Sequence, residues 1–383
     1  MKKLFYFGLL GLSLLEILKV YLIMPMPGSQ AMDSIDIAYF IHTYRLYFRV
    51  LFGLMIILGA LPAFRIKWWW LPVIPLLLAG YIVYYFNFDM TADKIFLEPQ
   101  KKLSFTNKSQ NLLGDTALVI GVVHNGEAKA YPVRYIGYHH QVRDTVGGKP
   151  VMVTYCTVCR TGRVFEPVVK GTPETFRLVG MDHFNAMFED SATKSWWRQV
   201  TGEAVAGPLK GTLLPEVESF QLSTGKFFWL YPFGVVMNPD EPSVIFYDSL
   251  ARYERGKSKS DLTKRDSLSW KEKSWVVGVQ HGTKTKAYDW NKLVEQRVIN
   301  DVIGDVPLVV ALSADNQSFV VYQRPDNKQI FSIANDTLHS ETGKYNFSGR
   351  HLSPDSVSLT RLSAYQEYWH SWRTFHPGTE IFE

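Results

Sequence analysis

Apolar residues are concentrated near the start of the chain, in three long stretches at residues 4–24, 47–64 and 68–86. Each stretch is close to the roughly 20 residues that an α-helix needs to cross a bilayer. Three consecutive tryptophans at residues 68–70 open the third stretch, as in the aromatic belts of membrane interfaces. The pattern predicts a membrane region at residues 1–92 with three transmembrane helices. Glu16 and Lys19 interrupt the first stretch on one helical face, and we expect them to pair.

Basic residues around these stretches predict the orientation of the chain. Lys2 and Lys3 precede the first stretch, and Arg65 and Lys67 lie in the short loop before the third. The positive-inside rule places both segments in the cytoplasm, so the chain after about residue 90 faces the exoplasmic side. A cleaved signal peptide is the rival interpretation. The first stretch is long for a signal sequence and no small-residue cleavage site follows it, so we favour a membrane helix.

The remainder of the chain has the alternating pattern and turn residues of β-structure. Residues 116–133 read as two strands around an Asn125–Gly126 turn, which is the strongest short hairpin signal. Residues 149–156 and 163–169 are rich in β-branched and aromatic residues between glycines and prolines. Residues 362–372 are expected to form a C-terminal helix with an aromatic face.

An internal duplication organises this β-rich part. Residues 121–153 align without a gap to residues 278–310, at an offset of 157, with ten identities in 33 positions. The duplication predicts a first β-rich module at residues 93–237, a connecting segment at residues 238–264 and a second, homologous module at residues 265–383. The predicted fold class is α+β, with transmembrane helices followed by two duplicated β-rich modules.

Composition narrows the classes of function. The net charge is only +5, with no run of five like charges, so nucleic acid is not an expected partner. Arg160 follows Cys159, which excludes the haem-attachment motif, and there is no phosphate-binding glycine loop. We therefore expect no haem, nucleotide or flavin cofactor.

Cys156 and Cys159 are the only cysteines in the chain. The duplication allows their positions to be compared with the equivalent positions of the second module. They align with Ser313 and Asn316, and His140 aligns with Arg297, so the second module lacks these groups. A thiol pair needed only for folding would be expected in both copies. The difference favours a functional site in the first module. Because a strand precedes the pair and another follows it, we predict a hairpin turn and not the helix start of thioredoxin-like motifs.

Residues 144–167, with their Tyr-Cys-x-x-Cys stretch, and the Thr-Gly-Glu-Ala stretch at residues 201–204 resemble a large bacterial and archaeal family. That family is catalogued as domain of unknown function 3179. Its members carry a His-x-x-x-Asp pair that matches His140 and Asp144, whereas residues 181–185 depart from a stretch that is frequent in the family. The resemblance implies kinship of fold but no reaction. The apolar stretches and their flanking basic residues lead us to expect a protein of the bacterial inner membrane, with its large C-terminal part on the periplasmic or extracellular side.

Three functions remain open from the sequence. A hairpin Cys-x-x-Cys turn resembles half of a metal knuckle, and we expect Cys156, Cys159 and His140 to bind a transition metal (Cu, Zn or Fe), with Asp144 or His183 as a further ligand. The first alternative is a thiol–disulfide oxidoreductase that uses Cys156 and Cys159. The second alternative is a binding or structural module without catalysis. The membrane is the expected partner, and the sequence identifies neither a protein partner nor a small-molecule substrate.

Overall fold

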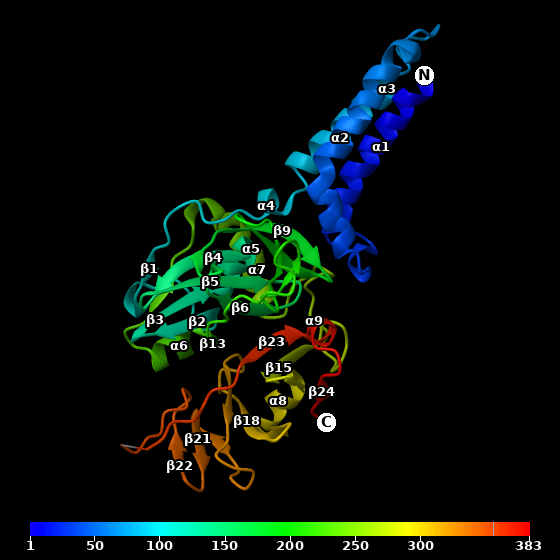
Figure 1. The fold of residues 1–383 in the computed structure, drawn as a ribbon. Coiled ribbons are helices and arrows are strands. Elements are labelled where there is room, and N and C mark those ends of the chain that lie inside the picture. Colours follow the sequence, from blue (N-terminus) through cyan, green and yellow to red (C-terminus); the bar gives the residue numbers. More distant parts are fainter. Residues whose placement is uncertain (355) are drawn as a thin grey trace. The chain divides into compact units, whose positions relative to one another are not determined.

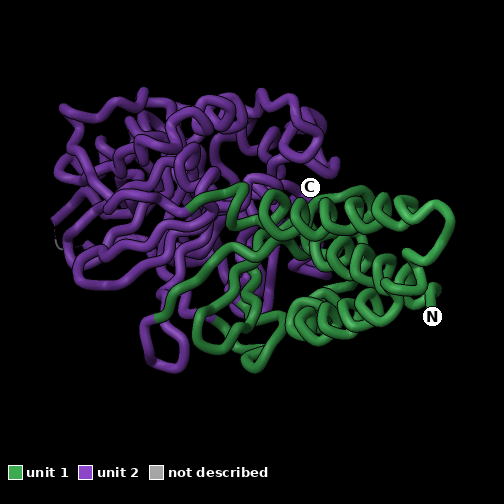
Figure 2. Tube along the Cα trace, turned by 90° about the horizontal axis from the view of Figure 1, so that it is seen from above, with its two compact units in different colours: residues 1–97, 174–198, 203–213 green, residues 98–173, 199–202, 214–383 purple. Residues whose placement is uncertain are grey.

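The computed structural model describes residues 1–354 and 356–383, which divide into two compact units (Figure 2). Unit 1 contains residues 1–97, 174–198 and 203–213, and unit 2 contains residues 98–173, 199–202 and 214–383. The helical N-terminal region therefore forms a unit with a segment from the middle of the chain. The module boundaries predicted from the sequence stay predictions.

Long apolar helices dominate unit 1 (Figure 1). They are α1 (Lys2–Tyr21), α2 (Ile35–Phe64) and α3 (Val73–Phe88), followed by the single turn α4 (Ala92–Ile95). In the described part of the chain, α1 and α2 are long and apolar enough to cross a membrane, whereas α3 has 16 residues and is shorter. The expected second span is also longer than the sequence pattern indicated. Polar residues at its start obscured a helix that begins at Ile35.

Close packing and a buried polar cluster join these helices. A side chain at Gly59 would meet the backbone nitrogen of Phe5 at 2.3 Å, so glycine lets α1 and α2 approach each other. Lys19 Nζ lies 2.8 Å from Glu16 Oε2, which confirms the predicted pair. Arg49 Nε lies 2.6 Å from Glu16 Oε1 as a second cation on this carboxylate.

The mid-chain segment of unit 1 forms a four-stranded antiparallel sheet in the order β12-β11-β10-β9. Its strands are β9 (Phe176–Asp182), β10 (Asn185–Asp190), β11 (Trp196–Arg198) and β12 (Ala204–Ala206). Buried indoles pair with acids on the neighbouring strand, since Trp196 Nε1 donates to Glu189 Oε2 at 3.0 Å and Trp197 Nε1 donates to Asp190 Oδ2 at 2.9 Å.

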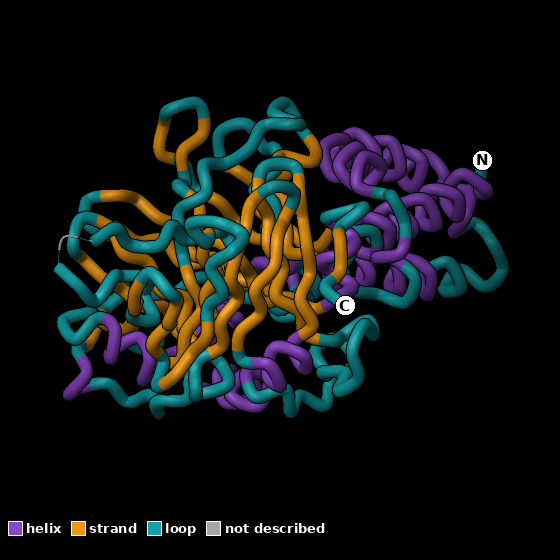
Figure 3. The backbone as a smooth tube through the Cα atoms, turned by 90° about the horizontal axis from the view of Figure 1, so that it is seen from below, coloured by secondary structure: helices purple, strands orange, loops and turns teal. Residues whose placement is uncertain are grey.

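Unit 2 is the β-rich part of the molecule, in which strands form several sheets flanked by short helices (Figure 3). Its first half contains β1 (Phe105–Thr106), β2 (Leu118–His124), β3 (Glu127–Pro132), α5 (Val133–His139), β4 (Gln141–Val146), β5 (Lys149–Cys156), β6 (Thr161–Phe165), β7 (Val168–Val169), β8 (Thr172–Pro173), β13 (Phe220–Ser223), α6 (Thr224–Leu230), β14 (Val235–Met237) and α7 (Val244–Glu254). The strands make the sheets β1-β14-β3-β2-β13 and β4-β5-β6.

The second half repeats this arrangement. It contains β15 (Trp275–His281), β16 (Lys284–Asp289), α8 (Trp290–Gln296), β17 (Val298–Ile303), β18 (Val306–Leu312), β19 (Phe319–Gln323), β20 (Ser332–Ala334), β21 (Thr337–Ser340), β22 (Gly343–Tyr345), β23 (Ala364–Tyr368), α9 (Trp369–Phe375) and β24 (Glu380–Ile381). Its sheets are β23-β15-β16-β24, β17-β18-β19 and β20-β21-β22. The run β2-β3-α5-β4 recurs as β15-β16-α8-β17 at the offset of the sequence repeat. The predicted α+β fold with repeated β-rich modules is confirmed.

Turn residues and a shared core explain why the halves fold this way. β2 and β3 pair antiparallel around Asn125 and Gly126, whose φ angles of 45° and 80° match the predicted two-residue turn. One hydrophobic cluster then continues from Val122 and Val153 in the first half to Val279 and Val310 in the second. Because this core is common to both halves, they form one compact unit.

The predicted C-terminal helix is wrong over its first half. Residues 364–368 form β23, which pairs with β15, and the helix α9 begins only at Trp369. Pairing with an open strand edge and burial of Tyr368 override the helical spacing of the aromatic residues. This strand also packs against β6, where a buried ion pair joins Arg163 Nη2 to Glu367 Oε1 at 2.6 Å.

Candidate functional site

Cys156 and Cys159 lie on the turn between β5 and β6, so the predicted hairpin setting is confirmed. Cys156 ends β5 and pairs with Thr161, the first residue of β6. Cys159 lies inside the turn, and Arg160 closes it with a φ angle of 58°. The structure holds both cysteines as buried thiols. A backbone hydrogen bond of 2.8 Å from Tyr368 N to Cys159 O ties the turn to β23.

Two basic side chains from the second half of the chain converge on this turn. Lys273 precedes β15, and its Nζ donates to the carbonyl oxygen of Val158, between the cysteines, at 2.9 Å. His370, on α9, places Nε2 at 3.1 Å from the same oxygen and 3.0 Å from Lys273 Nζ. The turn that carries the thiols is therefore held between an ammonium group and an imidazole.

Lys273 interacts electrostatically with both cysteines. Burial lowers the pKa of Lys273, and the negative charge of Cys159 and Cys156 in their ionised forms opposes this shift. By reciprocity, the ammonium group stabilises a thiolate on either cysteine. Burial, followed by the charge of Lys273, lowers the pKa of His370 to about 3, so this imidazole is neutral at physiological pH.

His140 lies at the end of α5 in the left-handed region, with a φ angle of 61°. Its carbonyl accepts a hydrogen bond of 3.0 Å from the backbone of Tyr155, which precedes Cys156. His140 Nδ1 lies 3.1 Å from Tyr138 O, and burial lowers the pKa of the imidazole to about 4. His140 is therefore a neutral side chain near the base of the cysteine hairpin.

Asp144 accepts hydrogen bonds from two residues whose counterparts in the second half make equivalent contacts. Its Oδ2 accepts from Tyr131 OH at 2.7 Å and from Lys129 Nζ at 3.0 Å. In the second half, Asp301 Oδ2 accepts from Tyr288 OH at 3.0 Å and lies 2.7 Å from the ammonium of Lys286. The repetition favours a scaffold role for Asp144.

His183 lies in unit 1, on the turn between β9 and β10, whereas the cysteines, His140 and Asp144 belong to unit 2. Its Nδ1 lies 2.7 Å from Asp182 Oδ1, and its Nε2 lies 3.2 Å from Asp33 Oδ1. The hydrogen bond to Asp182 raises the pKa of His183, against the effect of burial.

Across residues 1–354 and 356–383, no three His, Cys, Asp or Glu side chains form a group that could hold a metal ion. The described residues near the turn therefore do not make the tetrahedral donor set that zinc requires. Sequence reasoning missed Lys273 and His370. The signal was available, because position 116, at the repeat offset from Lys273, is a threonine.

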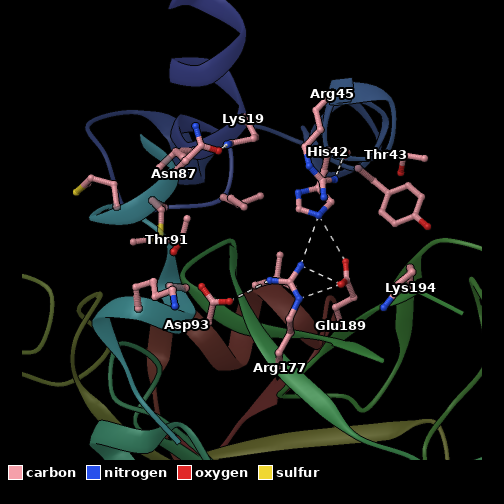
Figure 4. A pocket seen from close by; sticks show the side chains of 18 of the residues that line it. Lys19, His42, Thr43, Arg45, Asn87, Thr91, Asp93, Arg177, Glu189 and Lys194 are labelled. Atoms are coloured by element: carbon pink, nitrogen blue, oxygen red, sulfur yellow. Dashed lines mark hydrogen bonds and ion pairs between the residues drawn. The ribbon is translucent and has the colours of Figure 1, made fainter. Parts of the chain in front are cut away.

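Unit 1 contains a separate cavity of about 790 Å³ where the end of α1 and the beginning of α2 lie near β9 and β10 (Figure 4). Arg177 projects into it and donates to Glu189 Oε1 at 2.9 Å and to Asp93 Oδ2 at 3.4 Å. His42 Nε2 lies 3.6 Å from Glu189 Oε2 on the opposite wall. Ion pairs neutralise much of the charge on these walls, so they define no clear ligand preference.

Residues 100–379 match the family described as protein of unknown function (DUF3179), and the chain belongs to this family. No curated protein and no solved structure matches the chain.

Proposed function

We propose that this protein is a membrane-anchored thiol–disulfide oxidoreductase whose redox-active pair is Cys156 and Cys159. The observation that carries the proposal is the convergence of Lys273 and His370 on the turn between the two thiols. A positive charge next to a thiol increases the fraction of the reactive thiolate. Neither basic residue would be needed there for a turn that only connects two strands.

The anchor is assigned to the bacterial inner membrane, with the N-terminus inside and the β-rich part on the periplasmic or extracellular side. The two apolar helices support membrane association. The basic residues that precede α1 and α3 support this orientation through the positive-inside rule. A disulfide reaction suits this compartment, in which thiol pairs cycle between oxidised and reduced forms.

In the reducing direction, the Cys156 thiolate attacks one sulfur of a substrate disulfide, and the first substrate thiolate leaves as a mixed disulfide forms. The Cys159 thiolate then attacks the Cys156 sulfur, which forms the Cys156–Cys159 disulfide and releases the second substrate thiolate. Two electrons pass to the substrate, and two protons from the cysteines balance the released thiolates. A dithiol reductant regenerates the pair by the reverse steps.

Access to the thiols is part of this proposal. Both cysteines are buried, and Thr157 is the partly exposed residue of the turn. Exchange therefore requires the turn to move outward. This movement would have to break the contacts of Lys273 and His370 with the Val158 carbonyl and the backbone bond from Tyr368 N to Cys159 O.

The full-length protein in detergent, equilibrated in glutathione redox buffers and then alkylated, tests the proposal. We expect a reversible two-electron equilibrium between dithiol and disulfide, and Cys159→Ser should accumulate a mixed disulfide with glutathione at Cys156. The matched Cys156→Ser variant should accumulate much less. Thiols that stay reduced in every buffer, with no mixed disulfide in either variant, would contradict this function.

We infer, as a second candidate, that the same thiols bind a soft metal ion. The observation in its favour is the hairpin turn that carries both cysteines beside the Lys273 ammonium, because two thiolates on one Cu(I) ion leave a negative charge that this cation offsets. His140 would be a third ligand, as the sequence predicts, and zinc or iron would need still more ligands.

Metal analysis separates the two candidates. Under reducing conditions, the metal candidate predicts one equivalent of Cu(I) per chain, lost when both cysteines are changed to serine and weakened by His140→Asn. The redox candidate predicts thiol exchange without stoichiometric metal. If neither exchange nor metal depends on the cysteines, the binding or structural module without catalysis is the remaining function.

A further inference from the structure

Unit 2 contains a cavity of about 580 Å³, a size typical of small-molecule sites. It lies where the β5–β6 turn, the segment before β15 and the start of α8 come together. Its walls are formed by Thr116, Leu118, Arg160, Glu254, Arg255, Arg265, Trp275, Trp290, Asn291, Val294, Asn316, Gln317 and Gln366. Three arginines and one glutamate give this lining an excess of positive charge.

Two of the arginines sandwich one indole ring. The guanidinium carbon of Arg160 lies 3.7 Å from the centroid of the Trp275 ring, and that of Arg265 lies 4.0 Å from it. Cation–π contacts of this kind orient both groups toward the cavity that they line. Burial lowers the pKa of Arg265, and the charge of Arg160 lowers it further. The two cations therefore repel each other across the ring.

Within residues 1–354 and 356–383, the acceptors of hydrogen bonds from these guanidinium groups are neutral. Arg160, which is fully buried, donates to Gln366 Oε1 at 3.0 Å and to the backbone carbonyl of Glu254 at 3.0 Å. Arg265 donates to Asn291 Oδ1 at 2.9 Å, and its buried Nε has no acceptor among the residues that the structure describes. Donors on a buried cation are costly to leave without an acceptor.

The nearby carboxylates do not neutralise this pair. The carboxylate of Glu254 is occupied by Arg134, at 2.7 Å. Asp289 raises the pKa of Arg265 from a distance, while its Oδ2 accepts from Lys292 N and Ser269 Oγ at the start of α8. Among the residues that the structure describes, no carboxylate forms an ion pair with the buried Arg160 or with the partly buried Arg265.

We propose that this cavity binds a small organic anion, with a carboxylate or phosphate group held by Arg265 and attracted by the positive charge of Arg160 across the Trp275 ring. Guanidinium groups recognise both oxyanions through paired N–H donors. The side chains of Leu118, Trp290 and Val294 supply an apolar wall for the body of the ligand. The amides of Asn291 and Gln317 are available to orient its polar substituents. This binding site stands independently of the thiol chemistry.

Thermal unfolding and isothermal titration of the full-length protein in detergent test this site with defined probes. Benzoate and phenyl phosphate should raise the unfolding temperature in a concentration-dependent way, whereas the neutral analogue benzamide should not. The stronger of the two anions distinguishes a carboxylate from a phosphate ligand. Inorganic phosphate that binds as tightly as phenyl phosphate would overturn the assignment of an organic ligand.

Variants test whether anion binding takes place in this cavity. Arg265→Gln should weaken the binding of the stronger probe at least tenfold, and Arg265→Lys should restore part of it. Arg252→Gln, which changes an exposed arginine on α7 outside the cavity lining, is the matched control and should bind normally. Full affinity in Arg265→Gln would overturn the proposal.

A second measurement remains available if Arg265→Gln does not fold. Ligand binding should change the tryptophan fluorescence of the unaltered protein, because the guanidinium group of Arg265 that would bind the anion lies over the ring of Trp275. Trp275→Phe should lose most of this change. An unchanged signal on addition of every anion would argue against the site.

Discussion

Histidines buried in unit 2 make its stability sensitive to acid. The pKa of His140 is lowered to about 4 by burial, well below the value near 6.5 of an exposed histidine. The unfolded chain therefore binds a proton more readily than the folded chain between these pH values. Stability from the neutral imidazole is complete above pH 6.5 and is lost as the pH falls toward 4.

We expect the free energy of unfolding to decrease by about 3 kcal/mol from His140 alone between pH 6.5 and 4. Urea unfolding of the full-length protein at several pH values measures this slope. His140→Asn should flatten the slope, whereas the exposed His281→Asn should leave it unchanged. Equal slopes in all three proteins would show that His140 is not the titrating group.

Lys273 gives a prediction about thiol reactivity. Its ammonium group interacts electrostatically with both cysteines, and Lys273→Met removes this group. We expect the reaction of the thiols with a small disulfide at pH 7 to slow by about tenfold, because the thiolate loses the positive charge that stabilises it. The rate at pH 10, where thiols ionise without help, should differ much less.

The conservative control is Lys273→Arg, which retains the positive charge and should keep most of the rate. A variant that slows equally at both pH values would indicate a lost fold and not a lost charge. This comparison separates a positioning role of Lys273 from an electrostatic one.

At the residue scale, the sequence identified the thiols but not the groups that face them. The contrast between Cys156 and Ser313 in the repeat was sufficient to select the turn. Lys273 and His370 were missed because they approach through the pairing of β23 with β15, a long-range contact that no local pattern encodes. The predicted metal role of His140 and Asp144 stays a prediction.

At the scale of the elements, a buried ion pair joins β6 to β23. The ion pair between Arg163 and Glu367 is almost completely buried, and Thr161 Oγ1 donates to the same carboxylate oxygen at 3.0 Å. Removing one partner leaves the other charge buried and uncompensated, which is far more destabilising than the loss of an exposed pair.

We expect Glu367→Gln to lower the free energy of unfolding by about 3–5 kcal/mol. Glu272→Gln is the matched control, because Glu272 is an exposed acid that pairs with Arg373 at the surface, and it should cost less than about 1 kcal/mol. Chemical unfolding followed by circular dichroism measures both. Similar losses of unfolding free energy in the two variants would mean that the buried pair is not important for the contact between β6 and β23.

The element boundaries were predictable where turns and repeats were strong. The Asn125–Gly126 hairpin and the equivalence of β2-β3-α5-β4 with β15-β16-α8-β17 follow from local turn chemistry and the constant offset. The C-terminal region was not predictable in this way. Its aromatic residues fit both a helix and a strand, and only the open edge of β15 selects the strand.

At the scale of the whole molecule, the apolar helices predict how the protein behaves in a membrane. We expect the full-length protein to remain in the membrane fraction after an alkaline carbonate wash. Protease added to spheroplasts should digest the β-rich part, because the proposed orientation exposes it outside. Digestion only after the membrane is broken would indicate the opposite orientation.

The sequence also predicted the family and the α+β class of the whole chain, since the motif around Cys156 and Cys159 lies inside the matched region. The division into two units was not predictable. Residues 174–198 leave the first half of the β-rich part and join the N-terminal helices, and neither composition nor hydrophobic periodicity marks that change.

The position of β23 and α9 at the end of the chain has a consequence for synthesis. Cys156 and Cys159 leave the ribosome long before Tyr368 and His370, which complete the environment of their turn. With the proposed orientation, the two thiols emerge uncovered during export and meet the oxidants of the exoplasmic space. Maturation of the protein includes an interval in which its cysteines are open to modification, and translation of the last strand ends it.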